Sequence, residues 1–242
     1  MIVKLLGILT ALFFGLTSLA EVVEFPDEDL ATETVLPVFE NKIAVKNKNI
    51  DLDSSFEFGF LVGATLNEAF YKSEVFGINI GYHIDDLHGV AFHYFGWSGE
   101  LSSYGSQLQT APDTVIDDPI DFSKAPSAES MFMLNWEYNA FYGKLSLSKQ
   151  TVFNLHVYTL LGLGQIKFGD QSNVVINAGV GQRLYFSKNW GLRLDFNLMF
   201  YNGVDPTSRG ALDPSGPSFS ASDFSTKDYF NQSLTFGLFA ML

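Results

Sequence analysis

Cysteine is absent from the 242-residue sequence, and charged residues are scarce at 17%. Without cysteine the chain can form no disulfide scaffold, no thiol nucleophile and no cysteine-ligated zinc or iron–sulfur site. Basic residues number 14 against 27 acidic ones, which argues against a partner made of nucleic acid. Apolar residues are abundant instead, at 47%, and they include 24 phenylalanines. So apolar a composition argues against a chain that is disordered throughout.

The first twenty residues are typical of a secretory signal peptide. Lys4 is the one early charge, the apolar run covers residues 5–16, and Ala20 ends a stretch of small residues. The run is shorter than the roughly 20 apolar residues of a spanning helix, although an uncleaved anchor is the alternative. We therefore predict an exported protein that is cleaved after Ala20.

Residues 21–55 differ in composition from the rest of the chain. Acidic residues cluster at their start, and Pro26 and Pro37 break any helix. We expect an acidic, extended N-terminal arm in the periplasm. It is either a solvated leader or a segment that binds a partner.

From residue 56 to residue 242 the hydrophobic pattern repeats every two residues rather than every 3.6. Leu192, Leu194 and Phe196, for example, alternate with Arg193 and Asp195. Successive side chains of a strand point to opposite faces, so the pattern predicts strands with one apolar face. Such segments lie at 56–66, 74–84, 89–98, 131–142, 151–168, 174–186, 191–202 and 231–242. Most have the length of about 9–11 residues that a tilted strand needs to cross a membrane.

The two faces of these strands differ in a way that favours a membrane. One face carries bulky apolar residues at nearly every step, and the other carries glycine, asparagine and few charges. Large apolar residues suit lipid, and small or polar ones suit the interior of a narrow barrel. A soluble lipocalin-like barrel is the alternative. The aromatic residues expected inside are Phe95, Trp97, Phe141, Tyr158, Tyr185 and Phe239.

The lengths of the connections between the predicted strands also favour a membrane barrel. The second, fourth and sixth connections, at 85–88, 143–150 and 187–190, are short, whereas the third and seventh, at 100–130 and 203–230, are long. Antiparallel strands place odd and even connections at opposite ends of the barrel. Short periplasmic turns and long extracellular loops are typical of the outer membrane. The predicted fold is therefore all-β: a membrane-spanning, antiparallel, up-and-down β-barrel of about eight strands.

The C-terminus and several short motifs agree with this prediction. Thr235, Gly237, Ala240 and Leu242 resemble the terminal signal that the bacterial barrel-insertion machinery recognises, with leucine in place of the usual phenylalanine. Residues 43–242 resemble an outer-membrane β-barrel family of myxobacteria and predatory bacteria. The motifs that carry the resemblance lie at 56–60, 63–67, 81–83, 142–147 and 162–164. The resemblance implies a small outer-membrane barrel and brings no catalytic residues with it.

A few charged residues are expected inside the barrel, at Glu57, Glu137, Arg183, Arg193 and Asp195. A buried charge needs a partner, so we expect Arg183 and Arg193 to share Asp195 and a neighbouring acid. This set is either a satisfied internal network or part of an ion pathway.

The histidines do not form a recognisable catalytic or metal-binding pattern. His83 and His88 are expected at the periplasmic end, and His93 and His156 point inward, nearer the periplasm than the outer surface. The long outer loops contain no histidine, and no two histidines have the spacing of a ligand pair. We therefore expect neither an enzyme nor a cofactor or metal site. A lipid-modifying enzyme is the lower alternative.

At one place on the outward face, the residues are small or polar rather than bulky and apolar. Thr159, Ala178 and Gln182 lie outward on adjacent predicted strands, where small and polar residues permit close contact within a membrane. They are either ordinary scatter or a self-association face. The resulting hypothesis is a non-enzymatic outer-membrane protein that forms a homo-oligomeric ring and has a structural or lipid-organising role. The alternative is a porin-like channel for small solutes.

Overall fold

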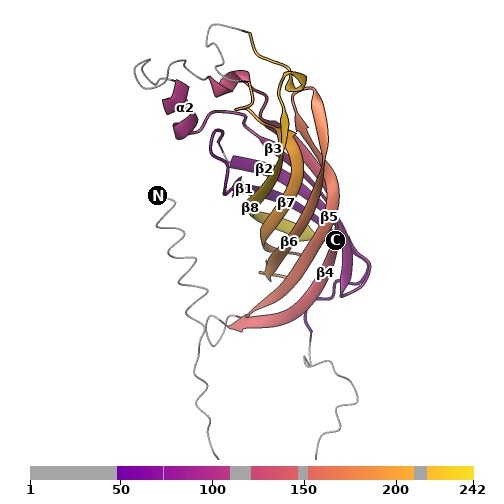
Figure 1. Ribbon diagram of the computed structural model, residues 1–242. Coiled ribbons are helices and arrows are strands. Elements are labelled where there is room, and N and C mark those ends of the chain that lie inside the picture. The colour runs from indigo at the N-terminus through magenta and orange to yellow at the C-terminus, as the bar shows by residue number, and fades with distance from the viewer. Residues whose placement is uncertain (1–47, 73, 110–120, 147–151, 210–216) are drawn as a thin grey trace, which may run out of the picture. The chain divides into compact units, whose positions relative to one another are not determined.

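The computed structural model describes residues 48–72, 74–109, 121–146, 152–209 and 217–242. Within these ranges eight strands pair antiparallel in sequence order, and β8 pairs with β1 to close a barrel (Figure 1). The strands are β1 (Ser55–Thr65), β2 (Glu74–His83), β3 (His88–Trp97), β4 (Ala128–Ser146), β5 (Val152–Phe168), β6 (Gln171–Tyr185), β7 (Trp190–Val204) and β8 (Thr226–Met241). The predicted fold is confirmed. The predicted signal peptide and most of the predicted acidic arm lie outside the described residues.

The β2–β3 and β6–β7 connections are short turns at one end of the barrel, and two long connections lie at the other end together with the short β5–β6 turn. The β3–β4 connection holds helix α2 (Ser103–Gln109) and the 3-10 helix η2 (Phe122–Lys124), and the β7–β8 connection holds η3 (Ala221–Asp223). Both are odd-numbered connections of an antiparallel barrel, so they lie at the same end. No helix in the described ranges is long and apolar enough to cross a membrane.

Side-chain exposure alternates along the strands as the sequence pattern predicts. On β1, Phe60 is 75% exposed and the next residue, Leu61, only 1%. Because neighbouring residues of a strand face opposite ways, one set covers the outside of the barrel and the other fills its interior. The outer surface is strongly apolar, with exposed side chains that include Phe76, Leu134, Leu161, Leu163, Val174 and Leu238.

One residue expected to point into the barrel points outward instead. Phe141 is 59% exposed, because a register irregularity between Asn139 and Phe141 interrupts the pairing of β4 with β5. An extra residue in one strand reverses the alternation beyond it. Tyr142 therefore turns inward and donates a hydrogen bond to Asn154. β4 also runs on to Ser146, so residues 143–146 are strand rather than the predicted turn.

The interior is layered. An apolar cluster near the long-loop end contains Leu61, Val75, Phe95, Met131 and Val175 among others. A second apolar cluster, at the short-turn end, contains Ile50, Leu52, Tyr185, Phe239 and Met241. Most of the buried polar and charged side chains belong to the layer between them. The interior is therefore filled by side chains along its length, as expected for eight strands.

Ile50 and Leu52 come from the segment that precedes β1. They are almost fully buried against the short-turn cluster. Asp86, in the β2–β3 turn, holds the segment by accepting hydrogen bonds from the backbone N–H of Leu52 (3.1 Å) and from Lys48. Burial alone would raise the pKa of Asp86, but these bonds outweigh it and hold that pKa below its usual value. The last residues before β1 thus close this end of the barrel.

Candidate functional site

The five charged residues expected inside the barrel lie together in its polar layer. Glu57 comes from β1, Glu137 from β4, Arg183 from β6, and Arg193 and Asp195 from β7. None of their side chains is more than 1% exposed. Because β1, β4 and β6 are not neighbours in the sheet, contacts among these residues must cross the lumen.

Each arginine bridges two glutamates. Arg183 donates through Nε to Glu57 (2.6 Å) and through a terminal nitrogen to Glu137. Arg193 donates to the other oxygen of Glu57 (2.7 Å) and of Glu137 (3.1 Å), and its Nε donates to Asp195 (2.6 Å). Arg193 therefore has the expected partners. Arg183 bonds the two glutamates rather than the expected Asp195, which reaches Arg193 within the same strand.

Further side chains complete this lumen charge network. The Tyr158 hydroxyl donates to Asp195, and its ring lies beneath the Arg183 guanidinium, 4.0 Å from ring centre to guanidinium carbon. Asn79 donates to Glu57 (2.7 Å), and Asn139 accepts from Arg183 (3.2 Å). Charge-assisted hydrogen bonds of this kind are among the strongest in proteins. The arrangement supplies the partners that buried charges require.

Glycine makes room for the network at one position. A Cβ on Gly181 would overlap both the Tyr158 ring and an oxygen of Asp195. Only glycine at position 181 leaves room for both the Tyr158 ring and the Asp195 carboxylate. The glycines of the inward face are therefore part of how the interior is packed.

Three of the four histidines point into the interior, and the fourth, His88, faces outward. His83 lies 3.3 Å from Glu57, His93 lies 3.1 Å from Arg193, and His156 lies 3.2 Å from the Tyr185 hydroxyl. His88 stacks on Trp136. In the described part of the chain, no group of three or more histidine, aspartate or glutamate side chains is placed to hold a metal ion.

The three residues of the candidate oligomer face lie on one side of the β5–β6 pair. Thr159 is exposed and pairs with Val180, and Ala178 and Gln182 are partly exposed two positions to either side of Val180. They form one continuous outward patch, here called the β5–β6 patch. Exposed Val180 lies between Ala178 and Gln182, and the exposed side chains of Leu161 and Leu163 lie beside the patch on β5.

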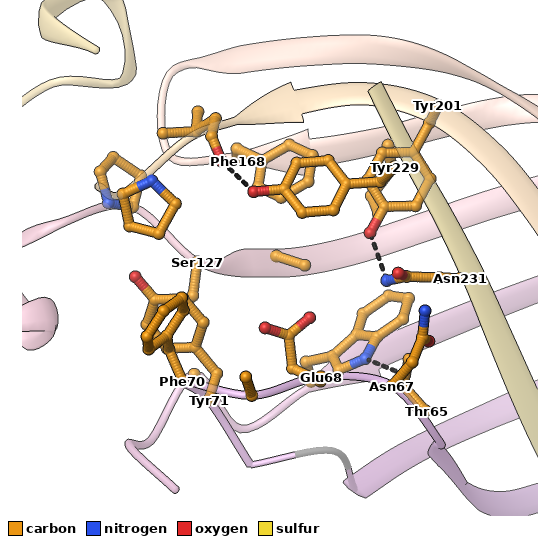
Figure 2. A pocket seen from close by; sticks show the side chains of 18 of the residues that line it. Thr65, Asn67, Glu68, Phe70, Tyr71, Ser127, Phe168, Tyr201, Tyr229 and Asn231 are labelled. Atoms are coloured by element: carbon orange, nitrogen blue, oxygen red, sulfur yellow. Dashed lines mark hydrogen bonds between the residues drawn. The ribbon is translucent and has the colours of Figure 1, made fainter. Parts of the chain in front are cut away.

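A cavity that sequence reasoning missed opens at the long-loop end of the barrel. Its volume is about 160 Å³, and its walls come from the β1–β2 loop, the β3–β4 connection, and the ends of β5, β7 and β8 (Figure 2). Aromatic side chains dominate the lining: Phe70, Tyr71, Trp97, Phe168, Tyr201 and Tyr229. A cluster of aromatic residues near strand ends is a weak signal in a sequence this aromatic, because such residues also pack cores and face lipid.

Glu68 is the acidic residue that lines this cavity. Figure 2 shows its carboxylate pointing into the space, with Tyr229 and Phe168 on the opposite wall. Burial raises the pKa of Glu68 above its usual value. The backbone N–H groups of Phe70 and Ala69 and the charge of Lys227 act in the opposite direction and do not cancel the effect of burial.

Together, the closed sheet, the apolar outer surface and the ion-paired interior define a small eight-stranded β-barrel. A solved structure similar to this chain is the N-terminal β-barrel domain of Pseudomonas aeruginosa OprF, at 14% identity over 78% of this chain and 98% of that chain, with a TM-score of 0.43. Neisserial surface protein A is similar at 13% identity over 78% and 97% of the two chains, with a TM-score of 0.36. Ail of Yersinia pestis, in complex with the heparin analogue sucrose octasulfate, is similar at 10% identity over 78% and 97%, with a TM-score of 0.33. No family model and no curated protein matches the sequence.

Proposed function

We propose that this protein is a non-enzymatic integral barrel of the bacterial outer membrane, with a structural or lipid-organising role that it performs as a homo-oligomer. The observation that carries the membrane assignment is the inversion of polarity across the barrel wall. Charged residues such as Arg183 and Asp195 are buried inside, whereas Phe60 and Leu163 point outward at 75% and 60% exposure. A soluble barrel would expose that apolar surface to water, and lipid accommodates it.

The filled interior supports a structural role over a porin-like one. The lumen charge network joins strands on different sides of the barrel, and apolar clusters lie at both of its ends. A barrel filled in this way has no wide aqueous path along its axis. Its activity is then exerted through its outer wall and its long loops.

The β5–β6 patch supports self-association. Small and polar residues allow close approach and hydrogen bonding within a membrane, where apolar surface alone gives no driving force. A patch that meets a complementary face on the next copy gives a closed ring. Such a ring would enclose lipid, which gives a barrel without an open lumen a means of organising the membrane around it.

The outer-membrane assignment is tested on intact cells. We expect the protein in the outer-membrane fraction, with a shift in gel mobility on heating, and surface protease should cut within 100–130 or 203–230. Cleavage confined to 21–55 would invert the topology and contradict the assignment.

The role is tested on the purified full-length protein. We expect oligomers by native mass spectrometry in mild detergent and no steady conductance steps in a planar bilayer. Steady single-channel steps would favour the porin-like alternative, and a monomer at every concentration would contradict the ring.

A further inference from the structure

The cavity at the long-loop end is separate from the lumen charge network and from the β5–β6 patch. At about 160 Å³ it is close in size to engineered cavities of about 150 Å³ that hold one benzene molecule. It therefore has room for one small ring or branched group. Its position between loops and strand ends places it at the mouth of the barrel.

The charges around the cavity leave one carboxylate unbalanced. Two lysines line the cavity with Glu68, but each has another acidic partner: Lys72 forms an ion pair with Glu100, and Lys227 lies 4.0 Å from Asp205. These five groups sum to one negative charge. The whole chain is also acidic, with a net charge of −13, which favours the approach of cations over anions.

Three of the hydrogen-bond donors in the wall are already in use. The Tyr71 hydroxyl donates to the carbonyl of Phe122 (3.1 Å), and the Tyr229 hydroxyl donates to the carbonyl of Val204 (2.7 Å). The Asn67 amide donates to the carbonyl of Phe230 (2.6 Å). Besides its two lysines, each of which has an acidic partner, the cavity offers aromatic ring faces and a carboxylate. This combination suits a cation with an apolar coat.

We propose that this cavity binds a small organic ammonium ion, with the charged nitrogen facing Glu68 and its methyl or methylene groups against Trp97, Tyr229 and Phe168. The chain shows the same preference internally, because the Lys227 ammonium already lies over the Tyr229 ring, 5.2 Å from its centre. Ammonium groups coated with carbon are attracted to aromatic faces, and an adjacent carboxylate adds direct ion pairing.

The test uses full-length protein in an uncharged maltoside detergent, with Trp136 and Trp190 replaced by phenylalanine. Both of these tryptophans are exposed on the outer surface, so Trp97 remains as the fluorophore. We expect tetramethylammonium chloride to change Trp97 fluorescence saturably, whereas tert-butanol and sodium chloride at equal concentration do not. Equal responses to tetramethylammonium and tert-butanol, or no response to either, would overturn the proposal.

Two variants in this background separate ion pairing from shape. Glu68→Gln keeps the size of the side chain and should weaken tetramethylammonium binding at least tenfold, which corresponds to about 1.4 kcal/mol. Glu74→Gln, an exposed acid at the start of β2 that does not line the cavity, is the matched control and should change the affinity less than twofold. Equal affinities for the two variants would refute the role of Glu68.

A pH titration tests the same point in the protein that retains Glu68, so its outcome does not depend on how Glu68→Gln folds. Binding should weaken on acidification, with a midpoint above the usual pKa of glutamate, because burial raises the pKa of Glu68. The titratable groups that line the cavity with it are Tyr71 and Lys72 from its own loop, Tyr201 from β7, and Lys227 and Tyr229 from β8. Binding that does not change between pH 4 and pH 7 would contradict the proposal.

The source of the ammonium group is decided by competition. Free ethanolamine should displace tetramethylammonium if the ligand is a soluble amine. If the ligand is a lipid headgroup, phosphatidylethanolamine vesicles should displace tetramethylammonium, and phosphatidylglycerol vesicles should not. If neither ethanolamine nor phosphatidylethanolamine displaces tetramethylammonium, the cavity binds only the probe, and the proposal that it serves as an ammonium site is contradicted.

Discussion

Arg193 is the most highly connected charge of the lumen network, so its replacement by methionine tests whether the network stabilises the barrel. The change removes the hydrogen bonds of Arg193 to Asp195, Glu57 and Glu137 and keeps much of the apolar length of the side chain. Glu57 and Glu137 would then keep only the guanidinium of Arg183, and Asp195 would have no arginine partner. Their burial prevents water from screening the remaining repulsion.

Removing one partner of a buried ion pair costs about 3–5 kcal/mol, because the other partner remains buried and uncompensated. We expect Arg193→Met to lower the free energy of unfolding by an amount in this range. Adding Asp195→Asn removes one of the stranded carboxylates. The double variant should therefore be more stable than the sum of the two single changes implies, by about 0.5–3 kcal/mol.

The measurement is urea unfolding of protein reconstituted in lipid vesicles, followed by tryptophan fluorescence, with heat-modified gel mobility as the check that each variant forms a barrel. Arg209→Met is the matched control. The Arg209 side chain is 40% exposed and lies 3.9 Å from Asp223, so its loss should cost less than about 1 kcal/mol. Equal losses for Arg193→Met and Arg209→Met would refute the view that the network stabilises the barrel.

Three further predictions concern the outer wall, the β5–β6 patch and the cavity. Phe196→Arg should destabilise the barrel by about 2–4 kcal/mol in vesicle unfolding if position 196 lies near the bilayer midplane, whereas Phe230→Arg, nearer the long-loop end, should cost about 0–1 kcal/mol. Thr159→Trp with Ala178→Trp should abolish oligomers in native mass spectrometry and keep heat-modifiable mobility, and a tryptophan at Leu238 should leave the oligomers intact. The raised pKa of Glu68 means that the fold binds this proton more tightly than the unfolded chain does, so stability falls as the pH rises from the usual glutamate pKa through the raised one. Glu68→Gln should therefore raise the unfolding temperature at pH 7, and the gain should disappear near pH 4.

The strands and the two faces of the barrel could be predicted from the sequence, because alternation is a local property of extended chain. Leu61 and Phe60 face opposite ways for no reason beyond their adjacency. The membership of the charge network could be predicted in the same way, since an inward position on any strand reaches the same narrow lumen. The prediction fails at Phe141, which points outward because an irregularity in the pairing with β5 reverses the alternation.

Partner choice across the lumen could not be predicted, because it depends on the stagger between strands and not on sequence distance. Asp195 is close in sequence to Arg193 and bonds it, but Arg183 instead reaches Glu57, 126 residues away. The burial of Ile50 and Leu52 and the cavity around Glu68 could not be predicted for the same reason. Local alternation determined which side chains face inward, and only closure of the sheet decided which of them meet, because closure fixes the height of every strand against all the others.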